Sequence, residues 1–571
     1  MKVDLLIKNV KVFNSYLKKF RDGNVAILDG KFLYIDNSKF EEFTSENVVD
    51  GNNRFMIPGF IDIHMHIESS MMTPVPFCHH LSKNGVTTIV AEPHEIANVF
   101  GEEGIEAMIK AEDSINTSVF YGVPSSVPST SEELETTGAI LDLEKMKKIA
   151  ENQRVICIGE IMNYRKVIKD NTLDICKFIE YVKENKPHYA IEGHCPKLLD
   201  LELAQFLYLG IDGDHTEHTL EEFKQRFENG MFMELQNKSL SDELLDYIDK
   251  NDLYEHFCFV TDDTMADTFL YEGHLNAVIK KAIKMGMNIE KAIYCGTYTP
   301  ARRMNMKDRG AIAPGKKADF ILLDNLQELN INKTFINGKE VYNSEREKEY
   351  IPTDYKFPNK FYKSIHLEKI NEDIFKIKVD KKKEKVNCRV IEVSDGSTRT
   401  KKLIKSINVK DGYLDWENSP YMLIAVFERH GKNRNIGFGL VTGDCIKKGA
   451  VATTYAHDHH NLMVIGKNAE DMVIAVNRII ELQGGICCVQ GKNIMNEVSL
   501  KVAGILSEKS VKELGKEIEI LRKNMKELGY KHYNPIMSLC TLSLPVSPEL
   551  KITDKGLIDV TEGKVVSLIV E

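Results

Sequence analysis

The chain has 571 residues, 43% of them hydrophobic and 28% charged, with a formal net charge of -10 at pH 7. This length predicts about two to four domains, and the composition excludes disordered and fibrous proteins. The negative charge argues against a general attraction to nucleic acid or to an anionic membrane surface, so a small-molecule substrate is favoured.

The first residues carry charges every few positions and no apolar core of signal-peptide length, and no run approaches about 18 apolar residues. The eleven cysteines form no CxxC pair, which predicts reduced thiols and argues against a cysteine-rich zinc module. We therefore expect a soluble, cytoplasmic protein.

Short strand patterns occur on both flanks of the chain. Asp29 and Gly30 in "AILDGKFLYI" suit the positive φ angles of a tight turn, which predicts a hairpin over residues 27–36. Comparable patterns recur at 310–325 and 333–343. We expect the two flanks to pair into one small β-sandwich domain, made of residues 1–57 and 308–350.

Between the flanks, apolar runs alternate with longer helix-like stretches, which is the pattern of repeated strand and helix units around a parallel sheet. The strand candidates are 59–66, 86–93, 117–123, 154–161, 188–194, 210–215, 231–236 and 257–263. Eight strands in about 250 residues predict a TIM-like (β/α)8 barrel. It would occupy residues 58–307.

The remaining residues, 351–571, predict a separate C-terminal α/β domain. They contain a strand-like run at 422–430 and a long amphipathic helix near 509–528. The Lys-rich tract at 376–385 is typical of a solvated edge.

The stretch "PGFIDIHMHIESS" alternates between two sets of side chains. The apolar set is Ile61, Ile63, Met65 and Ile67, and the polar set is Asp62, His64, His66 and Glu68. On a strand, alternate side chains share a face, so His64 and His66 can reach one metal ion. We expect the apolar set to face the surrounding helices and the polar set to face the barrel axis.

Ligand-type residues also end later strands of the predicted barrel. They are Glu160, His194, His215 and Asp262, the last followed by Asp263. Active sites of such barrels lie at the carboxyl ends of the strands. Nitrogen and oxygen ligands without thiolates suit Zn, Mn or Fe(II). His218 competes with His215, and we prefer His215 because it ends its strand.

These residues carry a resemblance. "GFIDIHMH", "TDD" and "GAIAPGKKADFILLD" are similar to the amidohydrolase superfamily. More narrowly, "HIESSMMTP", "AEPHEIANVFG", "GEIMNY", "EGHCP" and "HDHHNLMVIG" resemble the adenine deaminases over nearly the whole chain. The resemblance implies hydrolysis of adenine to hypoxanthine and ammonia in purine salvage.

The resemblance also implies roles for single residues. It places His64 and His66 on one metal and His194 and His215 on a second, with Glu160 as the bridging carboxylate. Asp262 corresponds to a ligand that also moves protons, so Asp262 and Glu160 are the expected catalytic groups. The implied cofactor is a binuclear divalent metal, Mn or Fe(II), with Zn possible. The chain departs from a "TDDxHP" pattern by having Met265 in place of the histidine.

An exocyclic amine on an aromatic ring is a poor leaving group, so the reaction needs a strong nucleophile and a proton donor. A metal lowers the pKa of its bound water towards about 7, which provides hydroxide at neutral pH. Asp262 could take the proton of that water and deliver it to the amine. Glu68, if protonated, or a neighbouring histidine could donate to the ring nitrogen.

Two further segments are candidates for contact with the substrate. Glu92, His94 and Glu95 follow the second strand and would lie, with Glu68, at the catalytic rim. In "YAHDHHNL", His457 and His459 share one face of an extended segment, and Asp458 and His460 share the other. This segment either contributes to the barrel mouth or a metal site, or it is a hydrogen-bonded structural loop.

Alternative functions remain open at this point. One is an amidohydrolase acting on another cyclic amide or N-acyl substrate, of the dihydroorotase or N-acetyl sugar deacetylase kind. Another is a metal-dependent binding protein without turnover. A cytidine-type deaminase is excluded because no PCxxC follows "HIE". The expected partner is a small purine, with no nucleic acid and no membrane, and the expected assembly is a homo-oligomer, with a dimer favoured.

Overall fold

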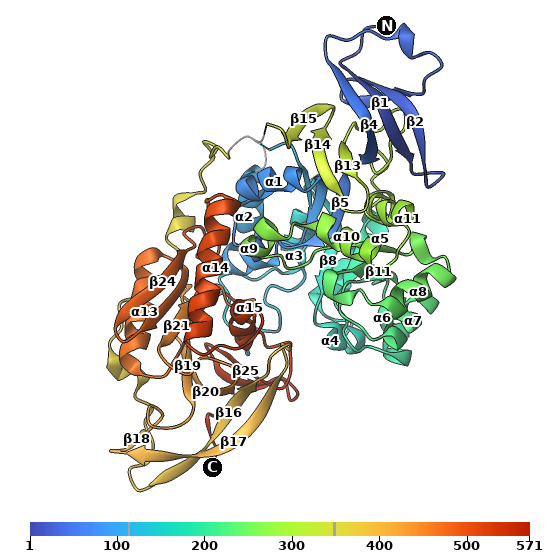
Figure 1. Cartoon of the computed structure of the whole chain (residues 1–571). Coiled ribbons are helices and arrows are strands. Elements are labelled where there is room, and N and C mark those ends of the chain that lie inside the picture. Colours follow the sequence, from blue (N-terminus) through green and yellow to red (C-terminus); the bar gives the residue numbers. More distant parts are fainter. Residues whose placement is uncertain (112–114, 347–349, 571) are drawn as a thin grey trace.

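The computed structural model of the chain describes residues 1–111, 115–346 and 350–570. A curled sheet containing the N-terminus occupies one end, a parallel barrel occupies the middle, and a C-terminal lobe (residues 350–570) occupies the other end (Figure 1). Within these residues, no helix has both the length and the apolar character needed to cross a bilayer.

Strands from both flanks of the barrel form one seven-stranded sheet, in the order β15-β14-β13-β4-β1-β2-β3. They are β1 (Leu5–Asn14), β2 (Lys19–Leu28), β3 (Lys31–Ile35), β4 (Val48–Pro58), β13 (Phe320–Asn325), β14 (Asn330–Ile336) and β15 (Lys339–Asn343). The predicted hairpin is confirmed, because β2 pairs with β3 across Asp29 and Gly30, which have φ angles of 51° and 69°.

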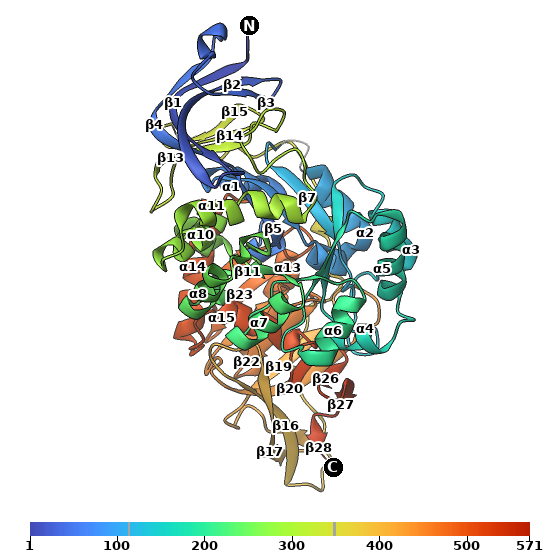
Figure 2. The ribbon, with the colours of Figure 1, turned by 90° about the vertical axis from the view of Figure 1, so that its right-hand side faces the viewer.

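This sheet differs from the two stacked sheets of the expected β-sandwich. It curls so that β3 returns to the segment before β13. The backbone N–H of Phe32 donates to the carbonyl of Lys316 at 2.9 Å, and that of Ala318 donates to Gly30 at 2.8 Å. The strands of both flanks form one bent sheet (Figure 2). Their apolar side chains belong to one buried cluster.

Eight parallel strands follow one another around the central sheet, as the sequence predicts. They are β5 (Phe60–Met65), β6 (Val86–Ala91), β7 (Ser118–Val123), β8 (Val155–Ile161), β9 (Ala190–Gly193), β10 (Gly213–Asp214), β11 (Phe232–Leu235) and β12 (Phe257–Phe259). The sheet closes where Asp262 bridges β5: its N–H donates to the carbonyl of His64 at 3.1 Å, and its carbonyl accepts from His66 at 3.3 Å.

Helices cover the outside of the barrel between successive strands (Figure 2). The longer ones are α1 (Pro74–Lys83), α2 (His94–Ala111), α5 (Asp174–Asn185), α6 (Asp200–Tyr208), α7 (Leu220–Glu228), α8 (Asp242–Lys250) and α10 (Leu275–Lys284). Local sequence starts several of them. Thr219 and Glu222 form a reciprocal capping box at α7, and Ser241 caps α8.

The first barrel strand contains a bulge. Its pairing with β6 advances from Asp62 opposite Ile89 to Met65 opposite Ala91, so that three steps along β5 match two along β6. An extra residue in one strand breaks the alternation of faces. The strict two-residue alternation expected for this strand is therefore wrong.

The bulge changes which side chains face the barrel axis. Ile61 and Ile63 lie in the interior and not against the helices, because they pack with side chains from strands around the barrel. These are Val90, Cys157, Ala190, Cys258 and Val260. Asp62 faces the opposite way: it accepts a hydrogen bond from Thr261 Oγ1 at 2.6 Å and lies 3.6 Å from Nδ1 of His274, at the start of α10.

The C-terminal lobe is built on a ten-stranded sheet, in the order β18-β17-β16-β20-β19-β22-β21-β23-β24 with β28 beside β16, and a three-stranded sheet. The strands are β16 (Lys385–Val393), β17 (Thr400–Lys410), β18 (Tyr413–Leu414), β19 (Met422–Phe427), β20 (Ile436–Gly443), β21 (Ala450–Thr453), β22 (Leu462–Gly466), β23 (Gly485–Gln490), β24 (Asn493–Ser499), β25 (Leu550–Thr553), β26 (Gly556–Asp559), β27 (Lys564–Val566) and β28 (Ile569–Val570).

Two long helices complete this lobe, α13 (Ala469–Leu482) and α14 (Val511–Glu527). The predicted amphipathic helix is confirmed as α14, which begins at a capping box of Ser510 and Glu513. The lysines of the Lys-rich tract are exposed, as expected of a solvated edge.

The lobe lies against the carboxyl ends of the barrel strands. Ser507 exchanges backbone hydrogen bonds with the segment after β5, donating to Met71 at 2.8 Å and accepting from Thr73 at 2.9 Å. Asp554 accepts from the backbone N–H of Thr136, in the loop after β7, at 2.9 Å. One apolar cluster runs continuously from the barrel helices into the lobe.

Candidate metal centre

The two histidines of the first strand present one ring nitrogen each to the barrel axis. Nδ1 of His66 donates to the carbonyl of Glu92 at 3.1 Å, which leaves Nε2 without a proton in the neutral ring. That Nε2 lies 3.6 Å from Glu160 Oε1 and 3.4 Å from Asp262 Oδ1. Nε2 of His64 is buried without a hydrogen-bond partner in the described structure.

Glu160 ends β8 and connects the two sides of the centre. While its Oε1 faces His66, its Oε2 lies 2.7 Å from Nδ1 of His194, just after β9. The same Oε2 lies 3.2 Å from Nε2 of His215, just after β10. One carboxylate therefore contacts histidines from three strand ends, which is the geometry of a bridging ligand.

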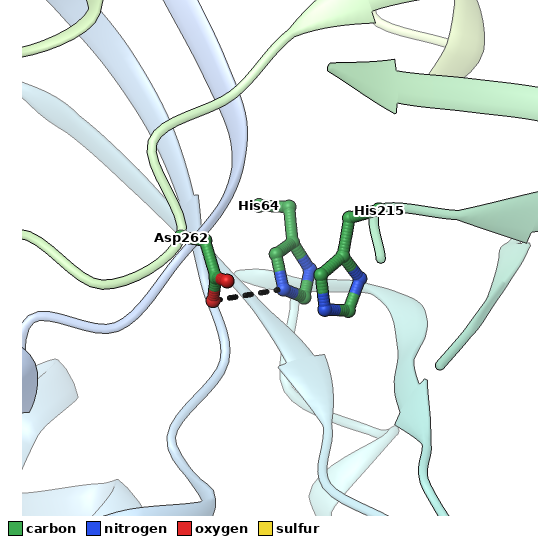
Figure 3. Close-up of side chains that lie close together, drawn as sticks. All are labelled: His64, His215 and Asp262. Atoms are coloured by element: carbon green, nitrogen blue, oxygen red, sulfur yellow. Dashed lines mark ion pairs between the residues drawn. The ribbon is translucent and has the colours of Figure 1, made fainter. Parts of the chain in front are cut away.

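Asp262 completes the cluster from the closing edge of the barrel. Its φ angle is 57°, a left-handed conformation that is uncommon for a residue other than glycine and often occurs at functional sites. The rings of His64 and His215 stack with centroids 3.8 Å apart, and Asp262 faces them (Figure 3). Its Oδ1 lies 3.8 Å from Nε2 of His64.

The electrostatics of the cluster favour an ionised carboxylate at Asp262. Burial alone would raise the pKa of Asp262, but the contact with His66 and the positive charges of His215 and Lys238 hold it well below its usual range. Burial likewise opposes the ionised form of Glu160, and contact with His194 and His215 holds the pKa of that carboxyl low.

The donor set fits divalent metal ions. Among the described residues, four overlapping groups of side chains at the centre could each hold an ion: His64, His215 and Asp262; His64, His66 and Glu160; Glu160, His194 and His215; and His66, Asp262 and Asp263. A fifth group, His94, Glu95 and Asp458, lies beside them. Within each group the ligand atoms lie within 4.8 Å of one another. The unpartnered Nε2 of His64 would otherwise be a costly buried acceptor. Imidazole and carboxylate ligands without thiolate match metals of the Mn, Fe and Zn kind.

The contacts around the centre show which of the residues considered from the sequence face it. Nε2 of His218 is bound to Asp214 at 2.6 Å, so His215 and not His218 faces the cluster. Asp263 accepts a hydrogen bond from Ser69. Glu234 of β11 is a neighbour that the sequence reasoning missed: its Oε2 lies 3.8 Å from Nδ1 of His64. The signal was a lone carboxylate in the apolar strand "MFMELQ".

Position 265, where the chain departs from the expected motif, contacts the C-terminal lobe. Met265 is buried, and its Sδ lies 2.9 Å from an Nη2 atom of Arg522 on α14. The same arginine forms an ion pair with Asp267 at 2.5 Å. The side chain at 265 therefore belongs to the seam between the barrel and the lobe.

The predicted rim residues all lie buried beside the centre. Oε2 of Glu92 accepts from the backbone N–H of Glu160 at 3.2 Å, so Glu92 helps to fix the position of Glu160. Nδ1 of His94 lies 3.6 Å from Glu160 Oε1. Glu68 accepts from the backbone N–H of Ile96 at 3.3 Å through Oε1, while its Oε2 has no hydrogen-bond partner. Burial raises the pKa of Glu68 to about 7.

The "HDHH" segment of the lobe reaches this rim. Nδ1 of His457 lies 2.7 Å from Glu95 Oε1, and Nε2 of His460 contacts Glu95 Oε2. Asp458 Oδ1 lies 3.3 Å from Nδ1 of His457 and 3.9 Å from Nε2 of His94. We call Glu95, His457, Asp458 and His460 the collar.

The adjacent histidines His459 and His460 make different contacts. Nδ1 of His459 accepts from the backbone N–H of Asn461 at 3.0 Å, and its carbonyl accepts from His430. Nε2 of His459 is buried without a hydrogen-bond partner among the described residues. His460, in contrast, contacts Glu95 of the barrel through its ring.

The comparisons with known proteins match both parts of the chain. Residues 55–341 match the amidohydrolase family, and residues 397–564 match the adenine deaminase C-terminal domain. An adenine deaminase of Clostridium perfringens is 49% identical over 100% of this chain and 99% of that protein. Adenine deaminase 2 of Shouchella clausii is 47% identical over 100% and 99%. An adenine deaminase of Thermosipho melanesiensis is 37% identical over 100% and 97%.

Proposed function

The chain belongs to the amidohydrolase family and, within it, to the adenine deaminases, and we propose that its buried histidine and carboxylate centre performs the hydrolytic deamination of adenine. Water replaces the exocyclic amino group, so that adenine and water give hypoxanthine and ammonia. The observation that supports this assignment best is the convergence of ligands from five strand ends on one barrel mouth, in a chain similar to adenine deaminases over its whole length.

In this proposal the centre would hold two divalent ions. His64 and His66 would bind one and His194 and His215 the other, and Glu160 could serve both because its Oε1 faces His66 and its Oε2 faces His194 and His215. Bound divalent metal lowers the pKa of water, which supplies a nucleophile at neutral pH. Mn or Fe(II) is the expected ion, and Zn fits the same donors.

Asp262 is the proton carrier. Its carboxylate is buried, ionised and within 4 Å of both His64 and His66, so it adjoins the point where the metal ligands converge. A carboxylate there accepts a proton as the water adds to the ring carbon, and returns it to the departing nitrogen. The amine then leaves as ammonia, which is a far better leaving group than the amide anion.

The ring end of the substrate needs a hydrogen-bond donor, because negative charge develops on the ring nitrogen next to the attacked carbon. Glu68 and His94 lie on this side of the centre. Glu68 has a buried, unpartnered Oε2, and His94 lies between Glu160 and the collar. We assign the ring contact to this pair, with Glu92 and Glu95 holding the pair in place.

Reconstitution tests the function directly. Protein stripped with a chelator should not turn over adenine, and addition of Mn or Fe(II) should restore the conversion to hypoxanthine, followed by ultraviolet absorbance. An N-acyl sugar and a cyclic amide are tested in parallel as the alternative substrates. Turnover of either of these without turnover of adenine would replace this function by the alternative amidohydrolase activity. Metal binding without turnover of any substrate would indicate a binding protein.

The assembly and location remain predictions. We expect a homo-oligomer, with a dimer favoured, and a cytoplasmic protein. Light scattering of the purified chain measures the first, because a dimer has twice the 65.0 kDa mass of one chain.

A further inference from the structure

A fully buried arginine lies behind the collar. Arg429 follows β19 in the C-terminal lobe and has no exposed surface. Its guanidinium donates to three chain segments. Nε donates to the carbonyl of His460, Nη1 donates to the carbonyl and hydroxyl of Ser364 at 2.9 and 2.8 Å, and Nη2 donates to the carbonyl of Ala503 at 2.9 Å.

This arginine has no ion-pair partner among the described residues. The carboxylate next to it in sequence, Glu428, points to other donors: its Oε2 accepts from the backbone N–H groups of residues 432, 433 and 434. A buried cation surrounded by neutral carbonyl groups is expensive compared with an apolar side chain. The planar fork of a guanidinium does, however, hold several carbonyl groups in one fixed arrangement.

The segment held by Arg429 is the one that reaches the barrel. The arginine takes the carbonyl of His460 while the ring of His460 contacts Glu95. Its own backbone N–H donates to Asn461 Oδ1 at 3.1 Å, and Asn461 Nδ2 donates to the carbonyl of Thr136, in a barrel loop, at 2.8 Å. The side chain of Arg429 thus binds the backbone of the segment that carries the collar histidines.

We propose that Arg429 is a positioning residue for the catalytic centre: it holds the 457–460 segment so that His457 and His460 orient the Glu95 carboxylate beside His94. The path runs from the guanidinium to the His460 carbonyl, through the His460 ring to Glu95, and from Glu95 to His94, which lies 3.7 Å away and reaches Glu160. Arg429 itself touches neither metal ligand nor substrate. The inference rests on the proposed function, because it gives the C-terminal lobe a part in that reaction.

The test compares two substitutions at Arg429 with a control in the same lobe. Arg429→Ala should lower kcat about 10²-fold, because displacing a group by about 1 Å at an active site has effects of that order. Arg429→Lys keeps the positive charge, but the single ammonium nitrogen of lysine cannot donate to all three segments at once. This variant should therefore lower kcat about tenfold. Metal bound per chain should stay at the wild-type value in both.

Val476→Ala is the control. Val476 is fully buried in α13 and belongs to an apolar cluster of the lobe, so the change should destabilise the lobe while every hydrogen bond of Arg429 and of the 457–460 segment is kept. Its kcat per folded chain should equal that of the wild type. Methylguanidinium added to Arg429→Ala should restore part of kcat, and it should not change Val476→Ala.

Two results would overturn the proposal. One is a kcat per bound metal in Arg429→Lys that equals the wild-type value, and the other is a loss of kcat no larger than the fraction of unfolded protein explains. If Arg429→Ala does not fold, Arg429→Lys decides. Hydrogen exchange gives a readout independent of adenine: the amides of residues 456–461 should exchange faster in Arg429→Lys than in Val476→Ala, and equal rates contradict the proposal. Failure of the unsubstituted protein to deaminate adenine is a separate result, which concerns the proposed function alone.

Discussion

The metal centre and the collar meet at one barrel mouth but are built in opposite ways. The candidate ligands of the centre come from strand ends of one repeating barrel, where five of the strands supply one or two side chains each. The collar joins two residues that are 365 positions apart, Glu95 and His460, across the seam between the barrel and the lobe. The comparison shows that the reactive groups of a site can follow a local sequence pattern while the residues that position them follow none.

The two halves also differ in what their side chains contact. Ligand atoms of the centre converge on a common point, and Nε2 of His64 has no hydrogen-bond partner. In the collar, both oxygens of Glu95 are already paired with histidines. We therefore expect substitutions in the centre to remove the chemistry, and substitutions in the collar to lower its rate.

The largest expected effect is at the centre. His64→Ala removes a proposed metal ligand and should abolish turnover of adenine, while Asp262→Asn removes the proton carrier and should lower kcat about 10²- to 10⁴-fold. Steady-state kinetics with hypoxanthine detection measures both. Metal content should fall in the first variant, and circular dichroism should show both folded. Full activity in either variant would contradict the ligand assignment.

The next effect is at the collar. Glu95→Gln and His460→Gln should each lower kcat about 10- to 10²-fold, because either change loosens the carboxylate that supports His94. The double variant should lose little more than the more damaging single variant, since the two residues act as one unit. Metal content by elemental analysis should be unchanged. Loss of metal together with activity would place the collar among the ligands instead.

The smallest effect is at His459, which lies within the same segment. Nδ1 of its ring accepts from the backbone N–H of Asn461, and among the described residues its Nε2 has no hydrogen-bond partner, so His459→Gln should change kcat by less than about threefold. This variant is the matched control for His460→Gln, one residue away. An equal loss at both positions would show that the whole segment, and not the contact with Glu95, matters for turnover.

Much of the barrel could be predicted from the sequence. Each of the eight strands forms where an apolar run was recognised, and the predicted ligands cluster because carboxyl ends of parallel strands share one mouth. His215 faces the cluster as expected, whereas His218 turns to Asp214, and the role of His215 as a ligand stays a prediction. The strands could be predicted because each depends on short-range periodicity.

The errors have different causes. Ile61 and Asp62 face the opposite sides to those expected, because a bulge in β5 breaks the alternation, and no residue in "GFIDIHMH" marks a bulge. The flanking strands form one curled sheet and not a sandwich, because β3 pairs with the residues before β13, far along the chain. Glu234 was overlooked because a single carboxylate in an apolar run has several structural explanations.

The sequence by itself determined the barrel and the order in which the histidines and carboxylates reach its mouth, since strand periodicity and strand ends are properties of a few consecutive residues. Only the tertiary structure decided that "HDHH" belongs to the same site and that Arg429 holds it there. Those contacts depend on where two lobes dock, and docking is set by surfaces assembled from distant segments. His459 and His460 look alike in the sequence, and only the docked fold distinguishes the ring that meets Glu95 from the one that does not.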